Sequence, residues 1–433
     1  MRIGIFTNTY KPEINGVVRS ISTFRDELER QGHAVYIFAP ESPGYGSYED
    51  TEAGIFRYPA IRLPVAENYP LAIPVSPHID WVVPRLKLHI IHSQHPVLLG
   101  EEAVNFAKRL NLPHVFTHHT QYEEYAHYIP FNRNIVKTLT REVVRSYLVR
   151  SVRIIAPTES MRAQIATNYP GISERLRTLP SPVDLSHFQF NPQKGSEIRE
   201  RYRLKNTFVF VTVSRLTPEK NVSTLLRAFA QATSGHPDTR LMLVGNGPLR
   251  HELEMLSQRL QIADRVIFVG TVPYDAVPAY LSAGDVFAFA STTETQGLVT
   301  LEAMATALPV VAVDAPGNRD VTRHGENGLL VPNTVTDLAL AMQNIIKSAD
   351  LRQKLGEGAQ KTAREYSAPA LTRKLVNIYE EAIAAYREHP IDYKRFSRET
   401  DDQRQFPPQW LTEITGTTEW FDSLAAFWKN FGT

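Results

Sequence analysis

Short apolar segments alternate with segments of helical periodicity along most of the chain, and this alternation limits the folds that it can adopt. Residues 2–7 and 34–39 have the content of strands, and residues 16–30 between them have the apolar spacing of a helix. A repeated order of strand, helix and strand predicts βαβ units and a parallel sheet. Further strands are expected at 89–93, 113–117, 153–157, 208–214, 240–245, 265–270, 286–290 and 310–313. We therefore expect an α/β fold with two doubly wound sheets.

Two domains are also expected from the length of 433 residues, which exceeds what one hydrophobic core usually organises. The stretch 179–195 is rich in Pro, Ser and Asn, so we place the boundary near residues 185–200. Ser367 is a suitable N-cap for a helix over about 367–387. The expected division is a first domain over 1–190, a second over 191–366 and a C-terminal appendage over 388–433.

The composition argues against several classes of protein. Hydrophobic residues make up 42% and charged residues 21% of the chain, and no apolar run is long enough to cross a bilayer. We expect no signal peptide, because the short apolar start is typical of a buried strand. The absence of cysteine excludes disulfides and Cys-ligated metals and agrees with a cytoplasmic protein. A net charge of +1 argues against nucleic acid as a partner.

The segment from Glu294 to Glu302 has the strongest chemical pattern. It leaves the predicted strand 286–290 and enters a helix, so it lies at the edge of the sheet where α/β proteins bind ligands. Gly297 would let backbone amides approach a phosphate, and the helix N-terminus favours an anion. Glu302, one turn into the helix, would accept ribose hydroxyls. The alternative is that both glutamates are solvated residues at a helix end.

Two cations follow the first strand of the same half. Arg215 and Lys220 belong to the loop after residues 208–214, beside the position expected for the phosphate. A guanidinium and an ammonium there would oppose the charge of one pyrophosphate. Either residue alone would usually be a surface charge, but the two together favour a functional role.

In combination these motifs resemble glycosyltransferase family four, whose members have the GT-B fold. The similarity covers about residues 1–387. It rests on an ordered series: Ser214-Arg215-Leu216 with Lys220, Val244-Gly245 with Gly247, the Glu294–Glu302 spacing, and Gly325-Glu326-Asn327-Gly328. The resemblance implies two Rossmann-like domains facing a central cleft, first an acceptor-side domain and then a nucleotide-sugar-binding domain. It also implies that the helix 367–387 packs back on the first domain.

The same resemblance implies a retaining, metal-independent hexosyltransferase. Arg215 and Lys220 would hold the donor diphosphate as it departs, Glu302 would bind the ribose, and Glu294 would support the donor sugar without forming a covalent intermediate. Backbone amides near the turn would contact sugar or phosphate, from Gly297, Leu298 and Val299. No Asp-x-Asp sequence occurs, so cationic side chains would neutralise the diphosphate. We expect no cofactor and no metal, with UDP-glucose as the co-substrate.

The first half contributes two further candidate segments. Gly16 stands where the backbone would pass close to the diphosphate, and Asn15 replaces one of the two glycines that are usual in the family. By resemblance His119 matches the histidine near the transferred sugar, with His118 as the second choice. The acceptor-side candidates that follow are Tyr122, Tyr125, His127 and Tyr128. A structural role is the alternative for any histidine taken alone.

The acceptor is expected to be a membrane lipid. The run from His119 to Tyr128, with Glu294-Thr-Gln-Gly297, looks most like bacterial diacylglycerol glucosyltransferases. A basic stripe on one predicted helix would suit an anionic membrane surface and place the protein at the inner face of the cell membrane, with Arg150 and Arg153 close behind. Its members are Arg133, Lys137, Arg141 and Arg145. A solvated helix face is the alternative.

Two other functions stay open. One is a transferase of the same family with a soluble sugar, polysaccharide or sugar-phosphate acceptor, and the other is a non-catalytic sugar-nucleotide-binding protein. In the appendage an aromatic stripe recurs at helical spacing, and it would pack either on the protein itself or in a membrane interface. Its members are Trp420, Phe421, Leu424, Phe427, Trp428 and Phe431.

Overall fold

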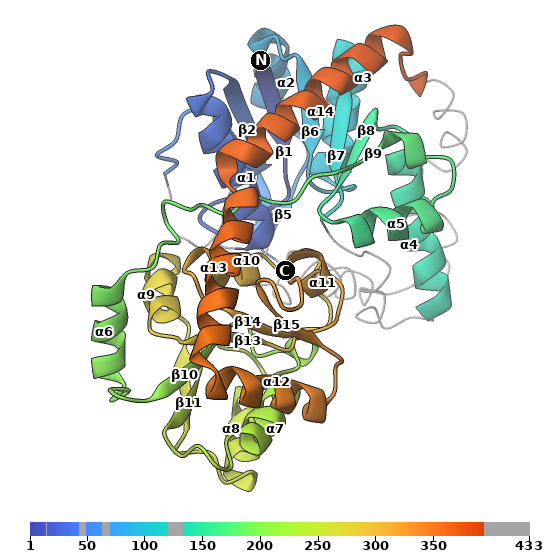
Figure 1. The fold of residues 1–433 in the computed structure, drawn as a ribbon. Helices are drawn as coiled ribbons and strands as arrows, with labels where there is room; N and C mark the ends of the chain where they lie inside the picture. Colours follow the sequence, from blue (N-terminus) through green and yellow to red (C-terminus); the bar gives the residue numbers. More distant parts are fainter. Residues whose placement is uncertain (14, 43–48, 63–69, 120–132, 394–433) are drawn as a thin grey trace. The chain divides into compact units, whose positions relative to one another are not determined.

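The computed structural model describes residues 1–13, 15–42, 49–62, 70–119 and 133–393 (Figure 1). Contacts between Cα atoms divide the chain into two compact units. The first unit comprises Met1–Leu179 together with the chain from Thr372 onward, and the second comprises Pro180–Leu371. The first unit is therefore built from two separate stretches of sequence.

A seven-stranded sheet forms the centre of the first unit, in the order β3-β2-β1-β6-β7-β8-β9. All its paired strands run parallel, with Ile3 of β1 opposite Val35 of β2 and Ile90 of β6. The central strands are buried apolar runs, as parallel strands covered on both faces usually are. The strands are β1 (Arg2–Phe6), β2 (Ala34–Pro40), β3 (Ile55–Tyr58), β6 (Ile90–Ser93), β7 (His114–Thr117), β8 (Arg153–Ala156) and β9 (Leu176–Thr178).

Helices and one small hairpin complete the first unit. Ser76, Thr158 and Asn15 each cap a helix by accepting a hydrogen bond from a backbone amide of its first turn. The helices are α1 (Gly16–Arg30), α2 (Pro77–Val82), α3 (Leu99–Leu110), α4 (Arg133–Leu148) and α5 (Glu159–Asn168), with 3-10 turns η1 (Val83–Leu86) and η3 (Ser173–Arg175). Strands β4 (Ala60–Arg62) and β5 (Pro70–Ala72) form the antiparallel hairpin.

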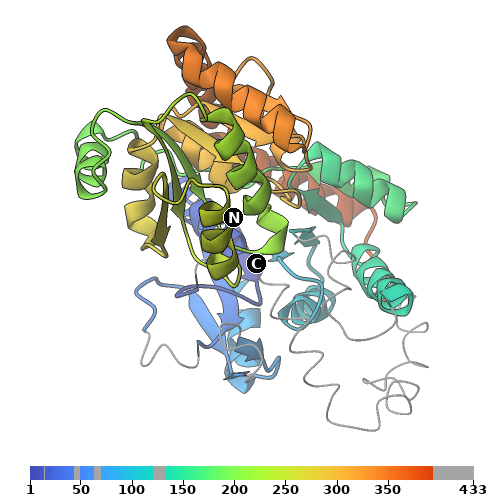
Figure 2. The same cartoon turned by 90° about the horizontal axis from the view of Figure 1, so that it is seen from below.

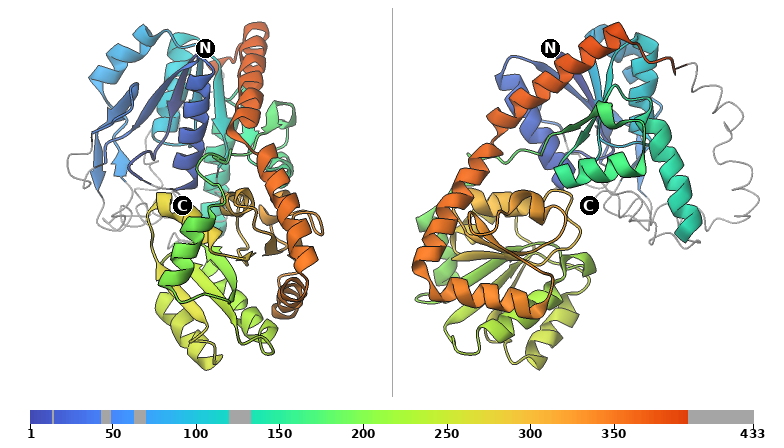
Figure 3. Two further views of the ribbon diagram at one scale, coloured as in Figure 1. Left: turned by 60° about the vertical axis from the view of Figure 1, so that its left-hand side comes forward. Right: turned by 45° about the vertical axis from the view of Figure 1, so that its right-hand side comes forward.

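The long helix α14 (Ala368–Glu388) belongs to the first unit from Thr372 onward (Figure 3). The Tyr379 hydroxyl lies 2.8 Å from Nδ1 of His92 on β6, and both side chains are buried. Near the end of the helix, the Tyr386 hydroxyl donates to Oδ1 of Asn111 at 3.0 Å. Hydrogen bonds and packing thus attach α14 beyond Thr372 to the first sheet.

The second unit has a six-stranded parallel sheet in the order β12-β11-β10-β13-β14-β15. Alternate residues of its strands enter two separate cores. Leu241 and Leu243 of β11 belong to one core, and Met242 and Val244 to the other. Figure 2 shows helices on both sides of these strands. This alternation follows from the two-residue period of a strand with both faces covered.

The elements of the second unit alternate between strand and helix. The strands are β10 (Phe208–Val213), β11 (Thr239–Val244), β12 (Val266–Gly270), β13 (Val286–Phe289), β14 (Val310–Val313) and β15 (Gly328–Val331). The α-helices are α6 (Pro192–Arg201), α7 (Val222–Ala232), α8 (Arg250–Arg259), α9 (Val277–Ser282), α10 (Leu298–Ala305), α11 (Asn318–Val321), α12 (Val335–Lys347) and α13 (Ala349–Glu365). Two 3-10 turns are η4 (Pro218–Lys220) and η5 (Tyr274–Ala276).

The division between the units falls earlier than the boundary expected near residues 185–200. The segment after Pro180 is attached to the second unit by its own contacts. The Ser181 amide donates to Gln296 Oε1 at 2.6 Å, the Val183 amide donates to the Tyr366 carbonyl at 2.9 Å, and Phe188 is buried in the second core. Composition indicated a linker here, but backbone amides and apolar side chains of this segment bind to the unit that follows. Among the described helices, none is both long and apolar enough to cross a membrane.

Candidate active site

Three loops of the second unit meet at the carboxyl edge of its sheet. They follow β10, β13 and β14, the neighbouring central strands of the sheet. The Thr292 amide, after β13, donates to the Glu219 carbonyl of the β10 loop at 3.1 Å. The Asn318 side-chain amide, after β14, donates to the Ser291 carbonyl at 2.9 Å. The β13 loop is therefore fixed from both sides, at the edge where α/β sheets bind ligands.

Lys220 and Glu294 form an ion pair between two of these loops. The Lys220 ammonium lies 2.5 Å from Oε1 of Glu294, and the side chains are only 18% and 16% exposed. The Ser291 hydroxyl donates to the same oxygen at 2.8 Å. Burial raises the pKa of Glu294, but Lys220, Ser291 and Arg215 outweigh it and hold the pKa below its ordinary value of 4.5. Glu294 is therefore an anion at neutral pH.

Arg215 lies on the same loop as Lys220 and is more accessible. Its side chain is 48% exposed, and Nη2 is 3.3 Å from Oε1 of Glu219. The Thr217 hydroxyl donates to that Glu219 oxygen at 2.6 Å. The structure thus brings Arg215, Lys220 and Glu294 together, with one cation partly buried and the other open to solvent. An anionic group bound here would meet both cations.

Helix α10 follows the β13 loop, and Gly297 is its N-cap. Gly297 has a left-handed backbone with φ of 76°, a conformation that glycine adopts without strain. Leu298 and Val299 are the first helical residues and are half-buried. Glu302, one turn on, is 4% exposed. The N-terminus of α10 therefore supplies backbone amides next to the Lys220–Glu294 pair, which is the environment that a phosphate prefers.

The sequence did not predict the two residues after β14 that pack against the loop bearing Glu294. Gly317 has φ of 76°, and a Cβ there would lie 2.5 Å from the Glu294 carbonyl oxygen. Asn318 is fully buried, and its amide also donates to the Val313 carbonyl at 3.1 Å. The only available sequence indication was Pro316-Gly317-Asn318, which predicts a turn but not what the turn contacts. A close approach of two backbones requires glycine at this position.

Gly245 and Gly247, which follow β11, likewise allow close backbone contact, here with the loop that bears Arg215. A Cβ on Gly245 would lie 1.9 Å from the Ser214 carbonyl oxygen, and a Cβ on Gly247 would lie 2.5 Å from that of Leu216. The Leu216 amide also donates to the Asn246 carbonyl at 2.9 Å. These glycines pack the arginine loop against the neighbouring strand end.

In the first unit, Gly16 is the first residue of α1 and follows the N-cap Asn15. Asn15 has an extended backbone with φ of −148°, and its Oδ1 accepts from the Val18 amide at 2.9 Å. The position therefore needs a capping side chain and not the conformational freedom of glycine, which explains how asparagine replaces one glycine of the usual pair.

The histidines after β7 differ in their surroundings. His118 is 2% exposed, and its ring meets Phe116 edge to face with centroids 5.8 Å apart. His119 is half-buried, and its Nε2 lies 2.7 Å from Oε1 of Gln94. Burial, with the rings of His95, His92 and His118, lowers the pKa of His119 well below 6.5. A neutral ring whose Nε2 faces a carbonyl presents Nδ1 as an acceptor. This geometry favours His119 over His118 for contact with a substrate hydroxyl.

The other acceptor-side candidates lie outside the described residues: Tyr122, Tyr125, His127 and Tyr128. The same holds for the aromatic stripe of the appendage. In the described part of the chain, no group of three or more His, Asp or Glu side chains is arranged to hold a metal ion.

The basic stripe lies on α4 as expected, and two of its members are exposed in the structure: Arg141 and Arg145. Two basic residues that the sequence placed close behind it are engaged elsewhere. The Arg150 guanidinium donates to both oxygens of Glu101 at 2.7 and 2.6 Å. Arg153 pairs with Glu381 of α14 at 3.4 Å. The free positive charge of this region is therefore smaller than the sequence suggested.

Comparison with solved structures identifies the fold. The chain superposes on Anabaena HepE in complex with UDP with a TM-score of 0.71 at 21% sequence identity, covering 88% of this chain and 100% of that one. Two Rossmann-like parallel sheets of this kind define the GT-B class of glycosyltransferases.

Comparison of sequences identifies the family. Residues 14–187 match the model described as Glycosyltransferase Family 4, and residues 195–362 match that described as Glycosyl transferases group 1. The alpha-monoglucosyldiacylglycerol synthase of Streptococcus pneumoniae is 34% identical over 320 residues, 73% of this chain and 72% of that protein. The protein of the same name from Acholeplasma laidlawii is 27% identical over 395 residues, 88% and 98% of the two chains. The chain thus belongs to glycosyltransferase family four.

Proposed function

We propose that the protein transfers glucose from UDP-glucose to diacylglycerol, with retention of anomeric configuration and without a metal ion. The observation that carries this proposal is the partly buried Lys220–Glu294 pair beside Arg215 and the N-terminus of α10. A diphosphate bound beside this pair would meet two cations and these backbone amides as it gains charge, and this supports the proposal. The acceptor is proposed from the two relatives, which are named as alpha-monoglucosyldiacylglycerol synthases.

In the proposed reaction, the bond between the anomeric carbon and the β-phosphate oxygen breaks. Arg215 and Lys220 stabilise the diphosphate as its charge grows, and Glu294 supports the positive charge that develops on the sugar. The acceptor hydroxyl attacks from the face that the phosphate leaves, and its proton passes to the departing phosphate oxygen. Nδ1 of His119 accepts a hydrogen bond from a sugar hydroxyl and holds the ring in position. The products are a glucosyl lipid and UDP.

A direct test incubates the purified protein with labelled UDP-glucose and with diacylglycerol in mixed vesicles. Parallel reactions replace the lipid with oligosaccharides or with a sugar phosphate. We expect label in a lipid product, with the anomeric configuration of the donor shown by NMR. Transfer only to a soluble acceptor would refute the lipid assignment, and donor binding without any transfer would indicate a non-catalytic binding protein.

The proposed lipid acceptor requires contact with a membrane surface, and α4 offers exposed Arg141 and Arg145 for it. Each basic residue near an anionic surface contributes about 1 kcal/mol. Reversing both to Glu is expected to weaken co-sedimentation with phosphatidylglycerol vesicles at least about tenfold. A matched control reverses exposed Lys354 and Lys361 on α13, which changes the net charge equally. Equal binding by both variants would show that α4 is only a solvated face.

A further inference from the structure

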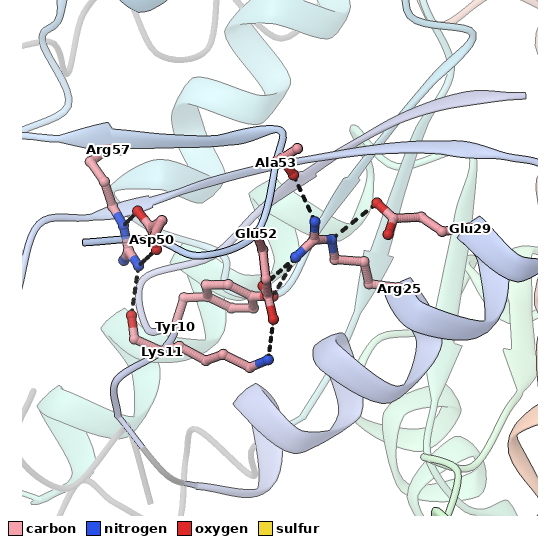
Figure 4. A network of polar contacts seen from close by, with 8 residues as sticks. All are labelled: Tyr10, Lys11, Arg25, Glu29, Asp50, Glu52, Ala53 and Arg57. Atoms are coloured by element: carbon pink, nitrogen blue, oxygen red, sulfur yellow. Dashed lines mark hydrogen bonds and ion pairs between the residues drawn. The ribbon is translucent and has the colours of Figure 1, made fainter. Parts of the chain in front are cut away.

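A network of charged side chains surrounds the beginning of the β1–α1 loop (Figure 4). Its centre is the carboxylate of Glu52, a residue of the segment that precedes β3. This carboxylate accepts hydrogen bonds from the Lys11 ammonium, the Arg25 guanidinium and the Tyr10 hydroxyl, the last at 3.0 Å. Arg25 is on α1 and its side chain is only 3% exposed. One carboxylate therefore joins the loop to the helix that follows it.

A second carboxylate acts on the same loop through an arginine. Asp50 accepts two hydrogen bonds from Arg57, at 2.9 and 2.6 Å. The same guanidinium donates to the Lys11 carbonyl oxygen at 2.6 Å and to that of Pro40 at 2.8 Å. Lys11 is thus held at its backbone by Arg57 and at its side chain by Glu52.

The segment that bears Glu52 is itself hydrogen-bonded to helix α1. Nη2 of Arg25 donates to the Ala53 carbonyl at 2.7 Å, so the carboxylate and its own backbone are attached to α1 by one side chain. On the other side of the loop, Asn15 donates to the Thr9 hydroxyl at 3.0 Å while its Oδ1 caps α1. The loop from Thr9 to Gly16 is therefore bonded at its start, at Lys11 and at its end.

Stability alone does not account for this arrangement. Removing charges from water is unfavourable, and an apolar cluster of the same volume often stabilises a fold equally well. What charged partners add is geometry, since each hydrogen bond fixes direction as well as distance. The network fixes the backbone that leads to Gly16.

We infer that Glu52 is a positioning residue that holds the loop from Tyr10 to Gly16 in the conformation that receives the donor diphosphate. This inference rests on the proposed function and on the expectation from the sequence that the backbone at Gly16 passes close to the donor diphosphate. Glu52 does not touch the substrate, because its carboxylate is occupied by Lys11, Arg25 and Tyr10. Its effect reaches the donor through the loop.

The test compares Glu52→Gln with Glu27→Gln. Glu27 is another carboxylate of this unit, more buried than Glu52, and it bonds to Arg30 and Gln31 at the far end of α1. Both variants lose a charged pair and some thermal stability. Only Glu52→Gln is expected to raise KM for UDP-glucose, by about tenfold or more, while KM for diacylglycerol stays unchanged. Amide hydrogen exchange of the peptide covering residues 7–16 should likewise accelerate only in Glu52→Gln.

Equal donor KM and equal exchange in the two variants would overturn the inference. If the wild-type protein fails to glucosylate diacylglycerol, the proposed acceptor is refuted. The role of Glu52 can still be tested, because the hydrogen-exchange measurement needs no catalysis. If Glu52→Gln does not fold, Lys11→Met removes only the loop-side partner and leaves the Arg25–Glu52 pair. That variant should show the same rise in donor KM and in exchange, and wild-type values for both would overturn the inference.

Discussion

Replacing Lys220 with methionine should reduce turnover far more than it reduces stability. The change keeps the length of the side chain and removes the ammonium that lies 2.5 Å from Glu294. Breaking a fully buried ion pair costs about 3–5 kcal/mol. Here both side chains are about one-sixth exposed and Ser291 remains bonded to the carboxylate, so we expect a loss of about 2 kcal/mol. For a unit of this size such a loss lowers Tm by about 4–8 °C.

The loss of turnover should be about 10²–10³-fold, because the contact between ammonium and diphosphate strengthens as the leaving group gains charge. Unfolding cannot account for it, since a domain with about 5 kcal/mol of stability stays almost entirely folded after losing about 2 kcal/mol. The assay measures initial rates at 20 °C beside a thermal melt, with exposed Lys354→Met as the control. If Lys220→Met turns over within about threefold of that control, Lys220 does not stabilise the transition state.

Three further outcomes are expected. Gly317→Ala should lower both Tm and kcat, because a Cβ there meets the Glu294 carbonyl at 2.5 Å and the residue has a positive φ. Differential scanning calorimetry measures Tm, and initial rates measure kcat. Unchanged values of both would show that the β14 loop can shift to accommodate the Cβ without cost. Transfer should continue in excess EDTA, and a loss of rate that magnesium restores would contradict metal independence. The pKa of Glu52 is lowered, since Lys11 and Arg25 outweigh the effect of burial. Its stabilisation is therefore fully present above pH 4.5 and is lost as pH falls through the lower folded pKa, so acid unfolding of Glu52→Gln should have a weaker pH dependence than that of wild type.

The sequence predicted the buried centre of each sheet well, because central parallel strands are continuous apolar runs. Helix α1 and strand β14 fall on the expected residues, and the other central strands agree within one residue at either end. Among the described strands, five were not predicted: β3, β4, β5, β9 and β15. All five are at sheet edges and have only three or four residues. A run of three or four residues is too short to show the periodicity of a strand.

For the candidate site, the sequence indicated which residues carry charge but not which partner each one meets. Lys220 and Glu294 are 74 positions apart and meet only because β10 and β13 are neighbours in the sheet. The same limitation led to an overestimate of the free charge behind the basic stripe, because Glu101 and Glu381 neutralise arginines that are distant in sequence. Loop-to-loop contacts such as Gly317 against Glu294 depend on tertiary structure and leave no local pattern.

Helix α14 makes the first unit discontinuous, and this affects the order in which the protein can fold during synthesis. The second unit, Pro180–Leu371, is contiguous and is complete before the residues of α14 beyond Thr372 have been made. Until then the sheet that begins at Met1 lacks the helix that covers His92 with Tyr379. Helix α14 therefore closes a sheet that was made before the second unit, and a nascent chain must keep that face of the sheet from aggregating while the second unit is translated. A fragment ending at Leu179 would expose the same face permanently.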